Sequence, residues 1–245
     1  MKKRTIFLSS LVVFLGTLIT FPVREMAFSP ALPNPLVPLL INPAMAQGNS
    51  PALPLSTPQE NNAGLLQQED LPPEFRALPS PVARSIGDRL RVVTRFFGQE
   101  NFQLDRYSAF VNPTDLQIIL GFTGSLPNQN DQLSFDSTIR QLQQPQFQQQ
   151  LVNLLRRNLS ELPQVNILDS QPLRNVNEVA NSSAGVRMTV QFRNQVWLID
   201  AVPFRRGGVG ALAAVVYPRN VASPLAVAAV ARRLDDRIIE NSLLR

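Results

Sequence analysis

The chain has 245 residues, with 23 lysines and arginines against 18 aspartates and glutamates, and it contains no histidine and no cysteine. Its only lysines are Lys2 and Lys3. Histidine acid–base catalysis, cysteine nucleophiles and, beyond the N-terminus, lysine Schiff bases are therefore excluded. The nitrogen and sulfur ligands that zinc and copper prefer are missing as well. We therefore expect no enzyme activity, no cofactor and no metal centre.

The N-terminal end has the pattern of an export signal. Basic residues 2–4 precede an apolar run at residues 5–23, and Ala44-Met45-Ala46 has the small residues of a cleavage site. We predict that residues 1–46 are a signal peptide that is cleaved after Ala46. In the alternative, residues 5–23 stay in place as a membrane anchor, because about 20 apolar residues span a bilayer. In both cases we expect an exported protein, in a periplasm, a thylakoid lumen or the extracellular space.

The chain beyond this segment is nearly neutral. Removing residues 1–46 takes away four basic residues and one acid, which leaves 19 arginines, 17 acidic residues and a net charge of +2. Such a small charge argues against nucleic-acid binding, which needs a dense cationic surface. The absence of histidine also argues against a pH switch near neutrality.

Composition divides the remaining chain in two. Residues 47–79 are rich in Pro, Gln, Asn and Ser and lack helical or alternating periodicity, which is typical of an extended, disordered linker. Residues 80–245 are long enough for a single domain with its own core. Because the chain has no cysteine, that core and not a set of disulfides must stabilise the fold.

The first half of this domain is expected to contain both helices and short strands. Ser80 followed by Pro81 resembles the start of a helix, and Asn112-Pro113-Thr114 resembles a turn between two strands. The expected elements are a helix, or a helix running into a strand, at 81–97, strands at 106–111 and 115–122, helices at 136–142 and 145–159, and a strand at 164–168.

The clearest pattern is a three-stranded antiparallel meander over residues 185–217. Apolar and polar residues alternate along its first strand, which indicates one buried face. Asn194-Gln195 is expected to form the first turn, which places Phe192 opposite Trp197, and Arg205–Gly208 is expected to form the second. The strands are expected at 185–193, 196–204 and 209–217. The resulting apolar face carries Met188, Val190, Phe192, Trp197, Ile199, Ala201, Leu212, Ala214 and Val216.

A last amphipathic helix is expected to cover that face. Ser223 resembles its N-cap and Pro224 its first residue, and the helix is expected to run to about Asn241. Asp235 and Asp236 are expected on its solvent side. Its apolar stripe consists of Val227, Val230, Ala231, Leu234 and Ile238. The predicted fold class is therefore α+β, with an antiparallel sheet flanked by helices in an α/β sandwich.

Two groups of polar residues are candidates for chemistry. Arg205 and Arg206, beside the Gly207-Gly208 turn, could hold a carboxylate or phosphate, although a hairpin with solvated arginines is the simpler interpretation. Asp200 could be a catalytic base, although a cross-strand ion pair with Arg187 is the simpler interpretation. The residues that we consider as ligand or partner contacts are Arg187, Arg193, Arg205 and Arg206.

The order of elements in the second half supports a family resemblance. A helix and a strand lead into a meander that contains AGVRMTVQF (184–192) and VPFRRGGVG (202–210), and ARRLDDRI (231–238) belongs to the closing helix. In this order the chain resembles the PsbP-like and DcrB-like group of exported α/β sandwich domains, which occurs in cyanobacterial lumenal and periplasmic proteins and in bacterial lipoproteins. The resemblance implies non-enzymatic accessory, assembly or sensor work. The photosystem-associated members have lysine-rich docking surfaces and histidine metal ligands, and this chain has neither, so no functional residue is carried over.

Three functional hypotheses follow. The leading one is a noncatalytic exported domain that binds a protein partner or another envelope component. The second is a carboxylate-dependent glycan hydrolase, which would need two acids facing one cleft. The third is a small-anion carrier that uses some of the four candidate arginines. The sequence contains no nucleophile elbow, phosphate-binding loop or EF-hand pattern that would support another activity.

Overall fold

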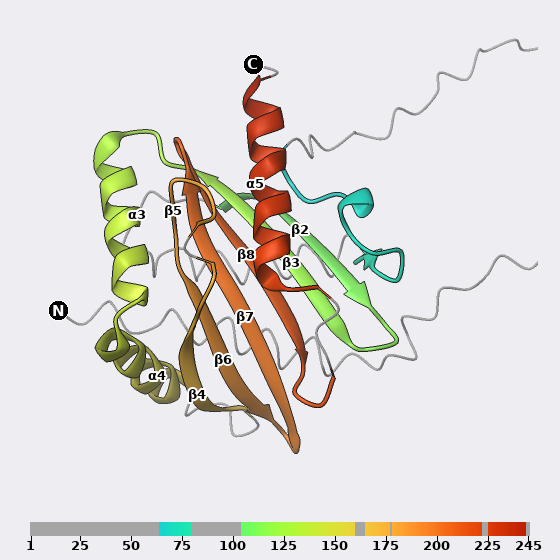
Figure 1. The fold of residues 1–245 in the computed structure, drawn as a ribbon. Helices are drawn as coiled ribbons and strands as arrows, with labels where there is room; N and C mark the ends of the chain where they lie inside the picture. Colours follow the sequence, from blue (N-terminus) through green and yellow to red (C-terminus); the bar gives the residue numbers. More distant parts are fainter. Residues whose placement is uncertain (1–63, 80–103, 160–164, 177, 222–224, 244–245) are drawn as a thin grey trace, which may run out of the picture.

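The computed structural model describes residues 64–79, 104–159, 165–176, 178–221 and 225–243 (Figure 1). The predictions for residues 1–46, for the helix that begins at Ser80-Pro81, and for Ser223 and Pro224 lie outside these ranges. Within them the chain forms an open antiparallel sheet with helices on both of its faces, so the predicted α+β fold is confirmed.

The sheet has eight strands in the order β1-β2-β3-β8-β7-β6-β4, and β5 pairs with β7 off this path. The strands are β1 (Arg76–Ala77), β2 (Leu104–Asn112), β3 (Gln117–Ser125), β4 (Val165–Leu173), β5 (Ser182–Ser183), β6 (Gly185–Phe192), β7 (Gln195–Arg206) and β8 (Val209–Pro218). The helices are a short 3-10 helix η2 (Gln68–Asp70), α3 (Gln129–Leu142), α4 (Pro145–Leu159) and α5 (Val227–Leu243). Strands β6, β7 and β8 form the predicted meander.

Both faces of the sheet are apolar, and each is covered by its own helices. The face that carries Trp197 and Ile199 packs against α3 and α4. The opposite face carries Val202 and Phe204, and α5 packs on it. In Figure 1, α5 lies in front of the sheet. The result is a three-layer arrangement in which the sheet separates two hydrophobic cores.

The predicted position of the last helix is wrong. We expected α5 to cover the face of Trp197, whereas its stripe packs on the other face. The reason is that β7 and β8 lie in the middle of the sheet and are apolar on both sides. The face opposite Trp197 therefore also has to be buried by a helix. Phe135 and Ile139 of α3 fill the Trp197 side instead.

The register of the first hairpin differs from the prediction by two residues. Phe192 pairs with Gln195, and Trp197 pairs with Val190. The turn therefore lies at residues 193–194, where Arg193 adopts a left-handed conformation with φ of 53°. Because side chains alternate with a period of two, a shift by two residues leaves every side chain on its predicted face.

Several predicted boundaries also move, while α4 begins and ends where the sequence indicated and β6 ends one residue earlier than predicted. Helix α3 begins at Gln129, seven residues before its predicted start, because the Asn128 side chain accepts a 2.9 Å hydrogen bond from the backbone N–H of Asp131 and caps the helix. Strand β4 continues to Leu173. Helix α5 begins at Val227, three residues after the predicted first position.

Residues 64–79 are packed on the domain, so the predicted linker is wrong for this part of the chain. We call these residues the strap. Leu66, Leu71 and Phe75 are buried on the α5 side of the sheet, and Leu78 is buried on the α3 side. Between these two sides β1 pairs with the edge of β2. The strap therefore wraps around the edge of the sheet and contributes to both cores.

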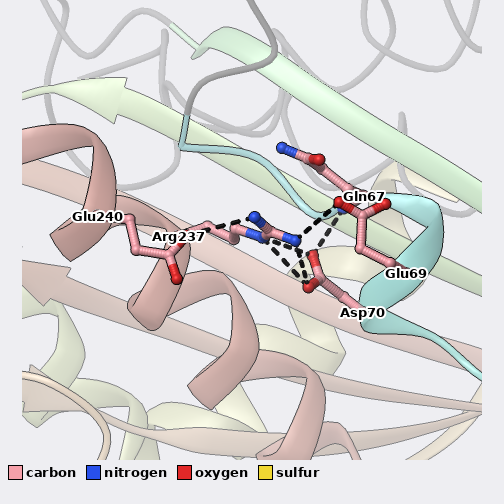
Figure 2. Close-up of polar contacts among 5 residues, drawn as sticks. All are labelled: Gln67, Glu69, Asp70, Arg237 and Glu240. Carbon is pink, nitrogen blue, oxygen red and sulfur yellow. Dashed lines mark hydrogen bonds and ion pairs between the residues drawn. The ribbon is translucent and has the colours of Figure 1, made fainter. Parts of the chain in front are cut away.

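Polar contacts join the strap to the last helix (Figure 2). The Arg237 guanidinium of α5 donates to Asp70 at 2.8 Å from Nη2 and 3.0 Å from Nε, and Nη2 also donates to Glu69 at 3.0 Å. Asp70 in turn accepts the backbone N–H of Gln67 at 2.8 Å, which caps η2. The beginning and the end of the described chain are thus held against each other.

Candidate functional site

Helix α5 covers only part of its face of the sheet. It packs on β7, β8 and β3, and none of the described helices lies in front of β4 and β6 in Figure 1. We call this uncovered area the open face. Its side chains form three cross-strand rows, which are Asn166–Gln191–Val196, Asp169–Thr189–Leu198 and Gln171–Arg187–Asp200.

The open face becomes more buried from the edge of the sheet inward. The three residues on β4 are exposed, the three on β6 are half-buried, and Asp200 on β7 is buried. Most of its polar groups are amides and hydroxyls, and Val196 and Leu198 add two half-buried apolar side chains. The face is therefore polar, nearly flat and only weakly charged.

A network of three side chains closes the inner end of the open face. Arg187 donates to both carboxylate oxygens of Asp200, at 2.6 Å from Nε and 2.7 Å from Nη2. The Tyr217 hydroxyl on β8 donates to Asp200 at 3.0 Å and accepts from Arg187 at 3.1 Å. Arg187 and Asp200 stand directly opposite each other in the register. The predicted cross-strand ion pair is therefore confirmed, with Tyr217 as an additional member.

This network shifts the pKa of Tyr217 and of Arg187. Burial is the largest cause that raises the pKa of Tyr217 to about 12, and the negative charge of Asp200 raises it further. The hydrogen bond from Arg187 to Asp200 raises the pKa of that guanidinium above its ordinary value. Tyr217 thus stays neutral and Arg187 stays charged at any physiological pH. Asp200 accepts three hydrogen bonds, which leaves it poorly placed to act as a general base.

Arg205 makes a second ion pair, on the α3 side of the sheet. Its Nε and Nη2 donate to Asp136 of α3 at 2.8 and 2.7 Å, and Ser182 donates to the same carboxylate at 2.5 Å. Burial alone would raise the pKa of Asp136, but the hydrogen bonds from Arg205 and Ser182 outweigh it and hold that pKa below the ordinary value. The pair ties α3 to β5 and β7.

Arg206, the next residue, makes a third ion pair on the opposite side. Its Nε donates to Asp235 of α5 at 2.7 Å, and its Nη2 donates to the second carboxylate oxygen. Asp235 is buried, so its predicted place on the solvent side of the helix is wrong. The hairpin with Gly207 at a φ of 54° is confirmed, but the prediction of solvated arginines is wrong. Consecutive residues of a strand point to opposite faces, so these two arginines hold one helix on each side.

Arg193, the fourth candidate contact, lies apart from the other three. It is exposed in the β6–β7 turn, and its guanidinium carbon is 5.3 Å from the centre of the Phe192 ring. This is the spacing of a cation–π contact. The structure therefore does not bring the four candidate arginines together. Trp197 is buried in the core, as its place in the alternation indicated.

The arrangement offers little to catalysis. The buried aspartates at 136, 200 and 235 are each held by their own arginine, and none of the carboxylate contacts reported above joins two acids as a glycosidase pair would require. Among the described residues, no group of three or more acidic side chains is placed to hold a metal ion. Across the same ranges, none of the helices is long and apolar enough to cross a bilayer.

Sequence reasoning missed most partners in these networks. The ion pairs of Arg205 and Arg206 join residues 69 and 29 positions apart, and no local pattern indicates them. The sequence could have identified Tyr217 as a member of the network, because alternation along β8 places it on the same face as Asp200. Comparison with protein-family models and with curated proteins gave no match for this chain.

Proposed function

We propose that the chain is a noncatalytic binding domain that works outside the cytoplasm and docks a protein partner on its open face. The observation that carries this proposal is the contrast between the two halves of the same sheet face. One half is apolar and lies under α5, while the other is a polar surface without a described helix over it. The export pattern of residues 1–46 motivates the proposed location.

The composition of the open face suits a transient protein interface. Such interfaces combine a small apolar centre with a polar rim that hydrogen-bonds to the partner. Val196 and Leu198 on β7 are the half-buried apolar groups, and the amides and hydroxyl of β6 and β4 lie beside them. A glycan would favour an exposed aromatic ring for stacking, and the rows of the open face contain none.

The edge strand β4, next to the open face, is a weaker candidate for the docking site. Arg156 of α4 donates at 2.8 Å to the carbonyl oxygens of both Ile167 and Leu168. The register of β4 against β6 is interrupted at the same place, and Pro172 follows in the strand. Bulges, prolines and blocked carbonyls hinder the addition of another strand. These features favour docking on the face over pairing with the edge.

The other two hypotheses receive less support. An anion carrier needs guanidinium groups that are available to the anion. Three of the four candidate arginines instead make bidentate hydrogen bonds to internal aspartates. A hydrolase needs a carboxylate that can accept or donate a proton, and Asp200 is committed to Arg187 and Tyr217. Turnover of a substrate that is lost in an Asp200→Asn variant would overturn the noncatalytic part of the proposal.

Site-specific photo-crosslinking tests the docking surface. The full chain is produced in its native host with a photoreactive residue at Thr189 on the open face, or at exposed Asp236 on α5 as the control. The protein captured from Thr189 is then purified, and its affinity is measured for the wild-type chain and for Thr189→Arg and Asp236→Arg variants.

We expect Thr189→Arg to weaken binding about tenfold or more, since it inserts a charge into the centre of the interface, and Asp236→Arg to leave it unchanged. Thermal unfolding of both variants provides the folding control. Equal capture from the two positions, or equal affinity of the two variants, would refute the open face as the docking site.

A further inference from the structure

The strap is built into the domain like a bound peptide. Leu66, Leu71 and Phe75 enter the core between α5 and the sheet, and the strap meets β2 through the two residue pairs of β1. Gly64 at the start of the strap has a φ of 82° and lies against Asn241 near the end of α5. Every one of these contacts joins the strap to a part of the chain that is distant in sequence.

The sheet has a notch that receives the strap. A Cβ atom added at Gly121 of β3 would lie 3.0 Å from Leu66 Cδ1 and 2.8 Å from Ser108 Oγ. The approach to Ser108 is closer than real Cβ atoms show and the approach to Leu66 is tighter than most, so a side chain at position 121 would have to displace Ser108 and press on Leu66. The absence of a side chain at Gly121 thus helps Leu66 to pack closely against β3, as an anchor residue packs in its pocket.

Charge adds to the match of shape. Arg237 is the groove's cation, and Asp70 is the strap's anion; both side chains are largely buried, with 21% and 14% of their surface exposed. The forked contact between them requires a carboxylate at one position of the bound segment. A segment that binds the groove must therefore carry a leucine for the notch and an acid for Arg237.

We propose that the strap is an exchangeable element, and that the groove between α5 and β2–β3 also accepts the strap of a second copy of this chain. The same contacts then form between two molecules, as in domain exchange. The second copy is the occupant that these observations favour, since its strap carries by identity the leucine, the acid and the aromatic anchor that the groove fits. This dimer leaves β4, β6 and their open face unchanged, so it is independent of the docking proposed above.

Complementary charge variants test the exchange in the full chain. In an Asp70→Arg chain the arginine of the strap faces the like charge of Arg237, and in an Arg237→Asp chain Asp70 of the strap faces a like charge at position 237. When the two variants are mixed, an exchanged pair matches opposite charges at both grooves. The η2 cap that Asp70 provides is lost in the Asp70→Arg chain whether it is mixed or not, so the mixture is compared with each variant alone.

We expect each variant alone to be monomeric, with amide hydrogen exchange in the strap about tenfold faster than in the wild-type chain. We expect the mixture to form a one-to-one heterodimer, measured by native mass spectrometry and light scattering, and the strap amides to regain protection in it. The chain that carries both substitutions should be monomeric, because its charges match within one molecule.

A second pair of variants provides the control. Arg206→Asp and Asp235→Arg disrupt an ion pair between β7 and α5, which the strap does not join, so their mixture should form no heterodimer. Only monomers in the mixture of strap variants, or a heterodimer in the control mixture as well, would overturn the proposal.

Discussion

The hydroxyl of Tyr217 provides the most direct test of the network at the inner end of the open face. The chain has two tyrosines, so in a Tyr107→Phe background every phenolate signal comes from Tyr217. Burial and the charge of Asp200 raise its pKa from 10.0 to about 12. We expect the ultraviolet absorbance of the phenolate to develop near pH 12 in the folded chain and near pH 10 in the same chain unfolded in urea.

The difference between these two values gives a stability change of known sign. The folded state binds the phenolic proton more tightly than the unfolded state, so the contribution is complete below pH 10 and is lost as the pH rises through 12. One pKa unit corresponds to about 1.4 kcal/mol, so the free energy of unfolding should fall by about 3 kcal/mol across this range. A Tyr217→Phe chain lacks this titration and serves as the control. Titration near pH 10 in a chain that circular dichroism shows to be folded would refute the buried network.

Two further predictions concern the attachment of the helices. Leu234→Ala empties a fully buried position of α5 and should lower the free energy of unfolding, measured by urea denaturation, by about 2–5 kcal/mol. Leu243→Ala on the same helix, at a position that is 80% exposed, should change that free energy by less than about 0.5 kcal/mol. Similar losses in the two variants would contradict the position of α5. Because the folded pKa of Asp136 is lowered, its contribution to stability is present above the ordinary carboxyl range and is lost as the pH falls through the folded pKa. Asp136→Asn should therefore flatten the acid limb of the stability curve, and an unchanged acid limb would exclude the ion pair with Arg205.

Local patterns predicted the parts of this fold that depend on neighbours along the chain. The alternation over residues 186–193 identified β6 and its buried face, despite an error of one residue in the turn and two in the register. The same alternation placed Arg187 and Asp200 on one face, although the predicted register set them diagonally and the structure pairs them directly. Helix α4 was likewise predicted from its periodicity to its first and last residues.

Local patterns failed where a segment is stabilised only by distant contacts. The strap has no helical or alternating periodicity. Its few buried apolar residues, such as Leu71 and Phe75, are surrounded in sequence by residues typical of a linker. Its burial depends on the groove that α5 and β3 make available. The partners of Arg205 and Arg206 were missed for the same reason, since each aspartate lies on a helix that is distant in sequence from the hairpin.

The sequence by itself determined that a three-stranded meander exists, which side chains share each of its faces, and which side of the last helix is apolar. Only the tertiary structure decided that α5 covers the face opposite Trp197, that α3 and α4 cover the other, and that no described helix lies over β4 and β6 on the α5 side. The physical reason is that periodicity shows that a surface must be buried but not what buries it. With two apolar faces and several amphipathic helices, the pairing between them is settled by packing across the whole domain.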